Sequence, residues 1–62
     1  MNKNTELFIK TIDSLAMCQG SYSRMSRDIH NAIDNDSSMI DDLDKNLPKF
    51  YNSLDVIGYL EQ

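Results

Sequence analysis

The sequence has a single cysteine, Cys18, and a single histidine, His30, among its 62 residues. One cysteine cannot form an internal disulfide, and a structural zinc site needs several Cys or His ligands. A chain of this length buries only about 60% of its unfolded surface, so small domains often depend on a disulfide, a metal or a partner chain. We therefore expect a homodimer or another partner protein.

Long hydrophobic runs are also absent, because the longest unbroken apolar stretches hold three or four residues. A membrane-spanning helix needs about 20 predominantly apolar residues. Met1 is followed by polar residues, Asn2 to Asn4, and no basic start followed by an apolar run, as in a signal peptide, is found. We therefore predict a cytoplasmic protein that has no membrane partner.

Positive charge is scarce, and the chain carries a formal net charge of −4. Residues 1–31 hold four basic and three acidic side chains, whereas residues 32–62 hold two basic and seven acidic ones. Lys and Arg that neutralise phosphates supply most of the affinity for DNA. The balance disfavours nucleic-acid binding by a monomer, although one mildly basic face could still bind it.

Glycine and proline are few, with two and one, and no stretch alternates β-branched with polar residues. Apolar residues recur instead every three or four positions, which is typical of helices. The pattern predicts one all-α domain over residues 1–62, a small bundle of three or four helices that we expect to be homodimeric.

The N-terminal half predicts helices over about 5–18 and 21–33, the first capped by Asn4 or Thr5. Gly20 and Ser21 favour a break between them. The apolar spacing nevertheless runs through both segments without a jump in phase, which would suit one long helix. Two helices and one continuous helix both remain open.

The C-terminal half begins with a turn, residues 34–38, whose Asp36 or Ser37 can cap a third helix that ends near Pro48. A short last helix follows, capped by Asn52 or Ser53. Its spacing directs Leu54, Ile57 and Leu60 inward, and Phe50 is expected to fill the gap between the last two helices.

Residues 16–29 partly match a helix-turn-helix, a motif that reads DNA. The match needs a one-residue deletion after Gly20, and the charge has the wrong sign. Arg24, Arg27 and His30 lie near one flank of the predicted second helix. They can contact an anion or an acidic partner chain, or they can form a solvated face in which Arg24 pairs with Asp28.

Aspartates cluster in residues 34–44 in a way that resembles the start of a calcium loop. Met39 and Lys45 stand where that loop needs its Gly and its bidentate Glu, so calcium is rejected. The cluster can instead imitate the phosphates of DNA on a partner protein, or it can only keep the chain soluble. The residues of this acidic face are Asp34, Asp36, Asp41, Asp42 and Asp44.

Motifs of catalysis are missing, since the chain contains neither a G-x-S-x-G elbow nor a glycine-rich phosphate loop. So short a chain also lacks the walls of an ordinary substrate pocket. We expect no enzyme activity and no cofactor, and we expect Cys18 to be a small buried apolar group.

One stretch resembles a motif of small uncharacterised proteins from phages and mobile elements of Gram-positive bacteria, L-x-x-x-Q-G-x-Y-G-R-L-x-R-D-I. Here it reads from Leu15 to Ile29, and the tail from Leu54 to Glu61 is also similar. Ser23 departs from the motif, which has Gly there, and residues 31–52 cannot be matched. The positions that recur in the motif are Gln19, Gly20, Tyr22, Arg24 and Arg27.

This resemblance implies an accessory protein of a phage or mobile element and brings no known chemistry. Proteins of that kind often bind and disable host machines, CRISPR nucleases among them. We therefore expect a non-enzymatic module that binds a host or phage protein through the five recurring residues, because Tyr and Arg are enriched at interface hot spots. The alternative is a small dimeric regulator that reads DNA through residues 21–31.

Overall fold

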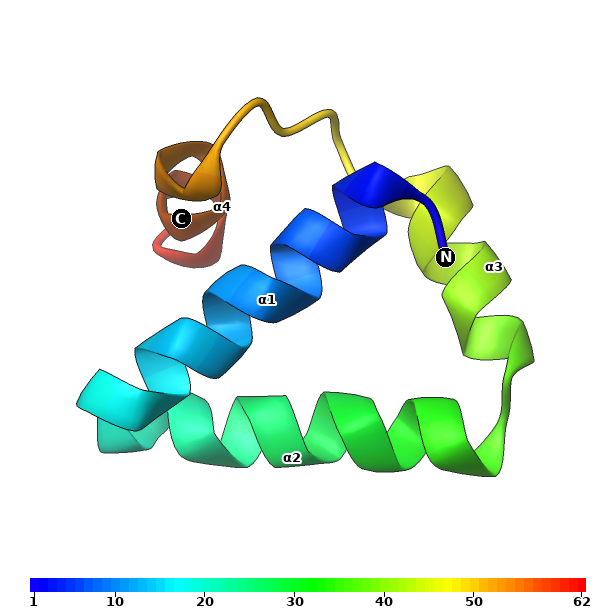
Figure 1. Ribbon diagram of the computed structural model, residues 1–62, viewed down its shortest axis with the longest axis horizontal. Helices are drawn as coiled ribbons and strands as arrows, with labels where there is room; N and C mark the ends of the chain where they lie inside the picture. The colour runs from blue at the N-terminus through cyan, green and yellow to red at the C-terminus, as the bar shows by residue number, and fades with distance from the viewer.

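The computed structural model describes all 62 residues and contains four helices and no strands. Helix α1 spans Lys3–Cys18, α2 Gly20–Asn35, α3 Ser38–Asn46 and α4 Ser53–Leu60. In Figure 1, α1 and α2 form a V, α3 closes its open end, and α4 lies on the other side of α1. Helix α1 packs against each of the other three, whereas α4 packs against α1 alone. The predicted all-α bundle is confirmed.

The break between the first two helices lies at Gln19, which has an extended backbone with φ −132° and ψ 117°. Its N–H donates to the carbonyl of Leu15 at 2.7 Å, and a new helix begins at Gly20. The Ser23 hydroxyl donates to the carbonyl of Ala16 at 3.1 Å, which satisfies one of the last acceptors of α1. Two helices, rather than one continuous helix, is therefore the correct alternative.

The core is small, since only seven residues of the chain are buried. Ile12 of α1 and Val56 of α4 are fully buried and lie in one apolar cluster. The remaining members of that cluster are Phe8, Ile9 and Phe50. Helix α2 contributes no fully buried residue, although Ile29 and Ile33 pack against the cluster.

Phe50 does not fill the gap between α3 and α4 that the sequence predicted. Its ring stacks on Phe8 of α1 with centroids 5.9 Å apart, and it meets Tyr59 of α4 edge-on at 5.6 Å. Phe8 and Tyr59 also contact edge-on, at 6.2 Å. The three rings therefore fix α4 to α1, because aromatic pairs at such distances attract in these orientations.

Two predictions of burial are wrong. Leu54 is 73% exposed, and Val56 occupies the fully buried position of α4. Because α4 packs only against α1, a narrow side of this helix is covered, and Leu54 lies outside it. Cys18 is also exposed rather than buried, since it ends α1 at the joint with α2.

Asn4 and Thr5, the predicted caps of the first helix, do not cap it, and their side chains bond to residues that are distant in the sequence. Asn2 is the cap, and its side chain accepts from the Thr5 N–H at 2.8 Å. The Asn4 amide donates to the carbonyl of Pro48 and accepts from the Phe50 N–H, both at 2.7 Å. Asn4 thus fastens the linker between α3 and α4 to α1.

The other boundaries agree with the sequence. Asp36 accepts from the backbone and hydroxyl of Ser38 at the start of α3, at 3.1 and 2.7 Å. Helix α3 ends at Asn46, two residues before Pro48, as Pro disfavours helix at the preceding position. Asn52 caps α4 by accepting from the Asp55 N–H at 3.1 Å.

Candidate protein-binding face

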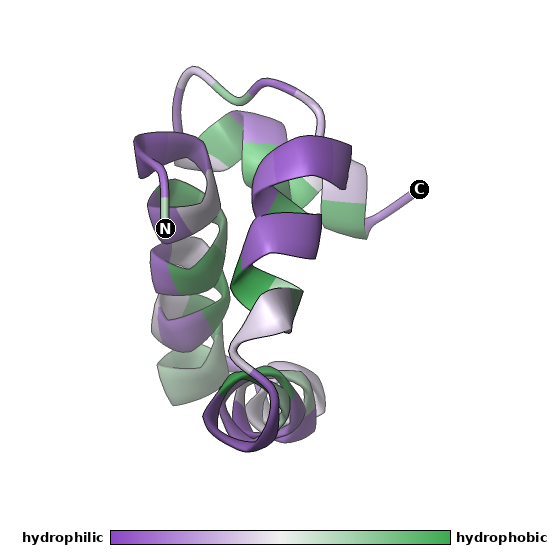
Figure 2. Cartoon of the chain, turned by 90° about the vertical axis from the view of Figure 1, so that its right-hand side faces the viewer, coloured by the Kyte–Doolittle hydropathy of each residue, from purple (hydrophilic) through white to green (hydrophobic).

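The five residues predicted to bind a partner all lie at the joint or on the first half of α2, but they do not form one face. Arg24 and Arg27 are exposed, whereas Tyr22 is half-buried. Successive residues of a helix are rotated by about 100°, so Tyr22 and Arg24 diverge by about 200°. Figure 2, which views α2 nearly end-on, shows the hydrophobic side of this helix turned towards the bundle. Because Tyr22 is half-buried and points away from Arg24, it belongs to the packed side.

Gln19 and Gly20 are exposed at the joint. A side chain added at Gly20 would meet nothing within 4 Å, and the residue has no positive φ. Nothing inside the chain therefore requires glycine at this position.

A shallow groove of about 530 Å³ lies between α2 and α3 beside Arg24. Its apolar part is formed by Met25, Ile29, Ala32 and Met39, and its polar part by Ser21, Arg24 and Asp28. The Arg24 Nε lies 3.9 Å from an Asp28 carboxylate oxygen, and both side chains remain largely exposed. Such a pair contributes little to stability, so these charges are free to contact another molecule. Methionines that line a groove adapt readily to the shape of a bound side chain.

A cluster of polar side chains around Asp13 joins α2 to α1. The Asp13 carboxylate accepts from the Ser26 hydroxyl at 2.7 Å and lies 3.0 Å from Nε2 of His30. His30 thus turns towards α1 and does not join Arg24 and Arg27, contrary to the prediction of one cationic flank. In a catalytic triad, the serine hydroxyl donates to the histidine, and the histidine donates to the aspartate. Here Ser26 donates directly to the Asp13 carboxylate, so the three residues do not have the arrangement of an activated nucleophile.

The predicted acidic face loses two of its five aspartates to structural roles. Asp36 is engaged at the start of α3, and Asp44 is half-buried against the start of α1. The remaining three, Asp34, Asp41 and Asp42, are exposed. No group of three or more His, Cys, Asp or Glu side chains lies close enough to hold a metal ion.

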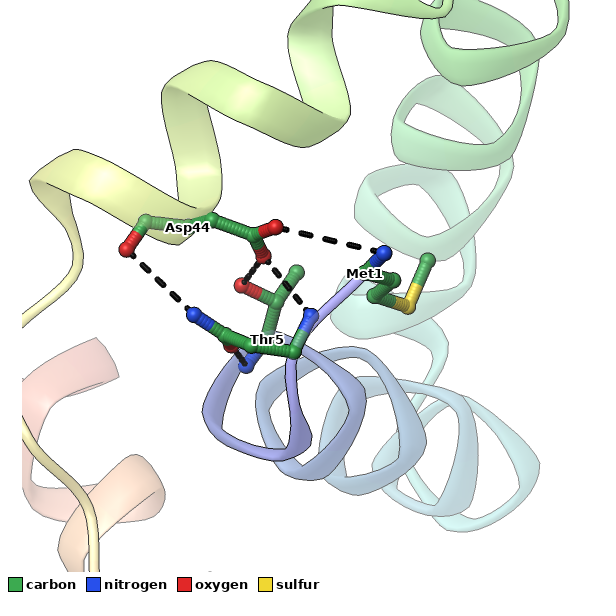
Figure 3. A network of polar contacts seen from close by, with 4 residues as sticks. Met1, Thr5 and Asp44 are labelled. Atoms are coloured by element: carbon green, nitrogen blue, oxygen red, sulfur yellow. Dashed lines mark hydrogen bonds and ion pairs between the residues drawn. The ribbon is translucent and has the colours of Figure 1, made fainter.

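Asp44 joins α3 to the beginning of the chain (Figure 3). Its carboxylate accepts from the Thr5 hydroxyl at 2.5 Å and from the Asn2 N–H at 3.1 Å, and it lies 3.9 Å from the amino group of Met1. The Thr5 hydroxyl, followed by the Asn2 N–H, lowers the pKa of Asp44 from its ordinary value of 3.8. The Ser38 hydroxyl, followed by the Ser38 N–H, likewise lowers the pKa of Asp36. Both groups therefore favour the charged form in the folded chain.

These two pKa shifts predict a loss of stability in acid. Because the folded pKa of each group lies below 3.8, their contribution is complete above that pH. It is lost as the pH falls through the folded pKa values, where the unfolded chain already binds the protons. Urea unfolding measured from pH 7 downwards should show this loss, and Asp44→Asn should flatten it. Asp41→Asn is the matched control, and an equal effect of both variants would contradict the role of Asp44.

Comparisons with known proteins do not place the chain in a family. No family model matches the sequence, and no curated protein or solved structure matches it significantly. No helix is both long enough and apolar enough to span a bilayer.

Proposed function

We propose that this chain is a non-enzymatic protein-binding module whose partner occupies the groove between α2 and α3. The observation that carries the proposal is the composition of this groove. It has an apolar part that includes two methionines, and an arginine at its border that is 88% exposed. Apolar contact surrounded by polar residues is the usual anatomy of a protein interface, and arginine is enriched at hot spots.

The class of partner follows from the resemblance to small proteins of phages and mobile elements. We propose a host or phage protein that handles nucleic acid and that this chain inhibits or regulates, as a CRISPR inhibitor would. The exposed Asp34 of α2 and the exposed Asp41 and Asp42 of α3 support a negative surface on the two helices that form the groove. Such a surface would attract the basic cleft of a nucleic-acid enzyme. We also propose that the module is cytoplasmic and homodimeric.

A second candidate is DNA binding through α2, which the shared outward position of Arg24 and Arg27 favours. Two features oppose it. The net charge is −4. The joint between α1 and α2 is one residue, Gln19, whereas a helix-turn-helix uses a turn of about three or four residues.

Paired charge variants test the proposal. Arg24→Ala with Arg27→Ala should abolish co-purification of the partner while leaving the fold intact, because both side chains are exposed. Met25→Asp should do the same by placing a charge in the groove. The control variant, Lys3→Ala with Lys10→Ala, also removes two positive charges, but from α1 and not from α2. It should still co-purify with the partner.

Equal loss in both double variants would indicate a nonspecific charge effect and would contradict the assigned groove. Binding to a labelled DNA duplex distinguishes the second candidate, DNA binding, from the proposed protein binding. A DNA reader would shift it at low salt and lose it steeply as the salt concentration rises, and a protein-directed module would not shift it at all.

A further inference from the structure

Helix α4 has an outward side that nothing in the chain covers, where Leu54 and Gly58 lie beside Tyr51 and Asp55. Leu54 is 73% exposed, and Tyr51 just before the helix is 82% exposed. Gly58, four residues after Leu54, is exposed and lies on the same side of the helix, one turn further on. Figure 1 shows α4 apart from α2 and α3, with only one of its sides turned towards α1.

Glycine at position 58 has no explanation within one molecule. No glycine of the chain has a positive φ, and a side chain added at Gly58 would meet nothing within 4 Å. Glycine inside a helix is nevertheless less favourable than alanine, because it loses more backbone freedom on folding. Close approach of another molecule is one structural role that glycine can have at such a position.

We propose that two copies of this chain associate through the outward side of α4, with the two helices antiparallel about a two-fold axis. Leu54 of each copy then packs over Gly58 of the other. A two-fold interface needs a patch that is complementary to itself. A projecting leucine and a bare glycine one turn apart meet that need, because an antiparallel pair places each projection opposite the other copy's depression.

Charge complementarity favours the same arrangement. Lys49 precedes α4, and Glu61 ends it. The last turn of α4 contains no basic residue, although the C-terminal end of a helix favours a cation. An antiparallel pair brings Lys49 of one copy to the C-terminal end of the other α4, beside Glu61. The contact of Lys49 with the end of α4 and its contact with Glu61 each occur twice in the symmetric dimer.

Surface area sets the expected strength. The chain exposes 4406 Å², whereas a compact monomer of 7.1 kDa exposes about 4100 Å². An eight-residue helix is only about 12 Å long, so its contact falls short of the roughly 800 Å² per partner of a standard interface. We therefore expect a weak, reversible dimer.

Sedimentation velocity over about 10 μM to about 1 mM protein tests this dimer. Leu54→Ala should weaken association at least about tenfold, since each substitution acts at two contacts. Gly58→Ala should also weaken association, while at low concentration it raises the thermal midpoint by a few degrees through better helix propensity. Opposite effects on the fold and on association distinguish this interface from simple unfolding. Met17→Ala removes another exposed apolar side chain, 89% exposed, and should change neither.

Charge reversal provides a second arm. Lys49→Glu and Glu61→Lys should each weaken the dimer, and the double variant should restore it. A chain that stays monomeric at about 1 mM would overturn the proposal. So would a dimer that tolerates both Leu54→Ala and Gly58→Ala. This inference rests on the homodimer of the proposed function, so its failure would remove that homodimer. The groove between α2 and α3 takes no part in these experiments, so the proposed partner binding would be left untouched.

Discussion

Replacement of Ile12 by alanine is expected to remove about 2–5 kcal/mol from the free energy of unfolding. Ile12 is fully buried at the centre of α1, the helix that packs against all the others. Truncation leaves a cavity in a core of five apolar residues, which has few neighbours that can move in to fill it. A domain of this size has a total stability of about 3–9 kcal/mol, so the substitution should remove a large share of it.

Urea titration followed by circular dichroism at the helix band measures this loss. Met17→Ala is the matched control on the same helix, because Met17 is exposed and should cost no more than about 0.5 kcal/mol. Equal midpoints for the two variants would show that α1 does not carry the core.

Replacement of Phe50 by alanine is expected to cost about 3–5 kcal/mol and to act first on α4. Phe50 connects the rings of Phe8 and Tyr59, and α4 packs against no helix except α1. Without the Phe50 ring, α4 keeps Val56 and Leu60 against the core and the edge-on contact of Tyr59 with Phe8. An isolated helix of eight residues is not stable in water, so α4 should unfold when it detaches.

Amide hydrogen exchange resolves the order of these events. Phe50→Ala should remove protection from residues 53–60 at concentrations below those at which copies associate, and α1 should keep more of its protection. Tyr51→Ala is the neighbouring control, since Tyr51 is largely exposed and outside the core cluster. Uniform loss of protection along the whole chain would instead indicate a single cooperative unit that includes α4.

Local signals in the sequence located most of the helices. Apolar spacing of three and four marked α1 and α2, and Pro48 marked the end of α3. Asn52 was identified as a cap because its short side chain can reach the free N–H groups of the next turn. The same reasoning failed at Asn4 and Thr5, because both bond to segments that are distant in the sequence.

The candidate site was predicted only in part. Arg24 and Arg27 are exposed as expected, but Tyr22 lies on the packed side and Met39 of α3 completes the groove. Helical periodicity places residues on one face of one helix, and it contains no information about which neighbouring helix covers that face. The pairing of His30 with Asp13 was missed for the same reason, since it joins residues 17 apart in the sequence.

The sequence by itself determined the class of fold, the approximate bounds of the helical segments apart from the break near residue 20, and the acidic character of residues 32–62. These properties depend on backbone preferences and charge, which each segment carries without its neighbours. Only the tertiary structure decided that Gln19 breaks the first helix, that Phe50 joins α4 to α1, and that Asp44 holds α3 to the start of the chain. Each of these depends on contacts between distant segments, and a single helical pattern is compatible with several such arrangements.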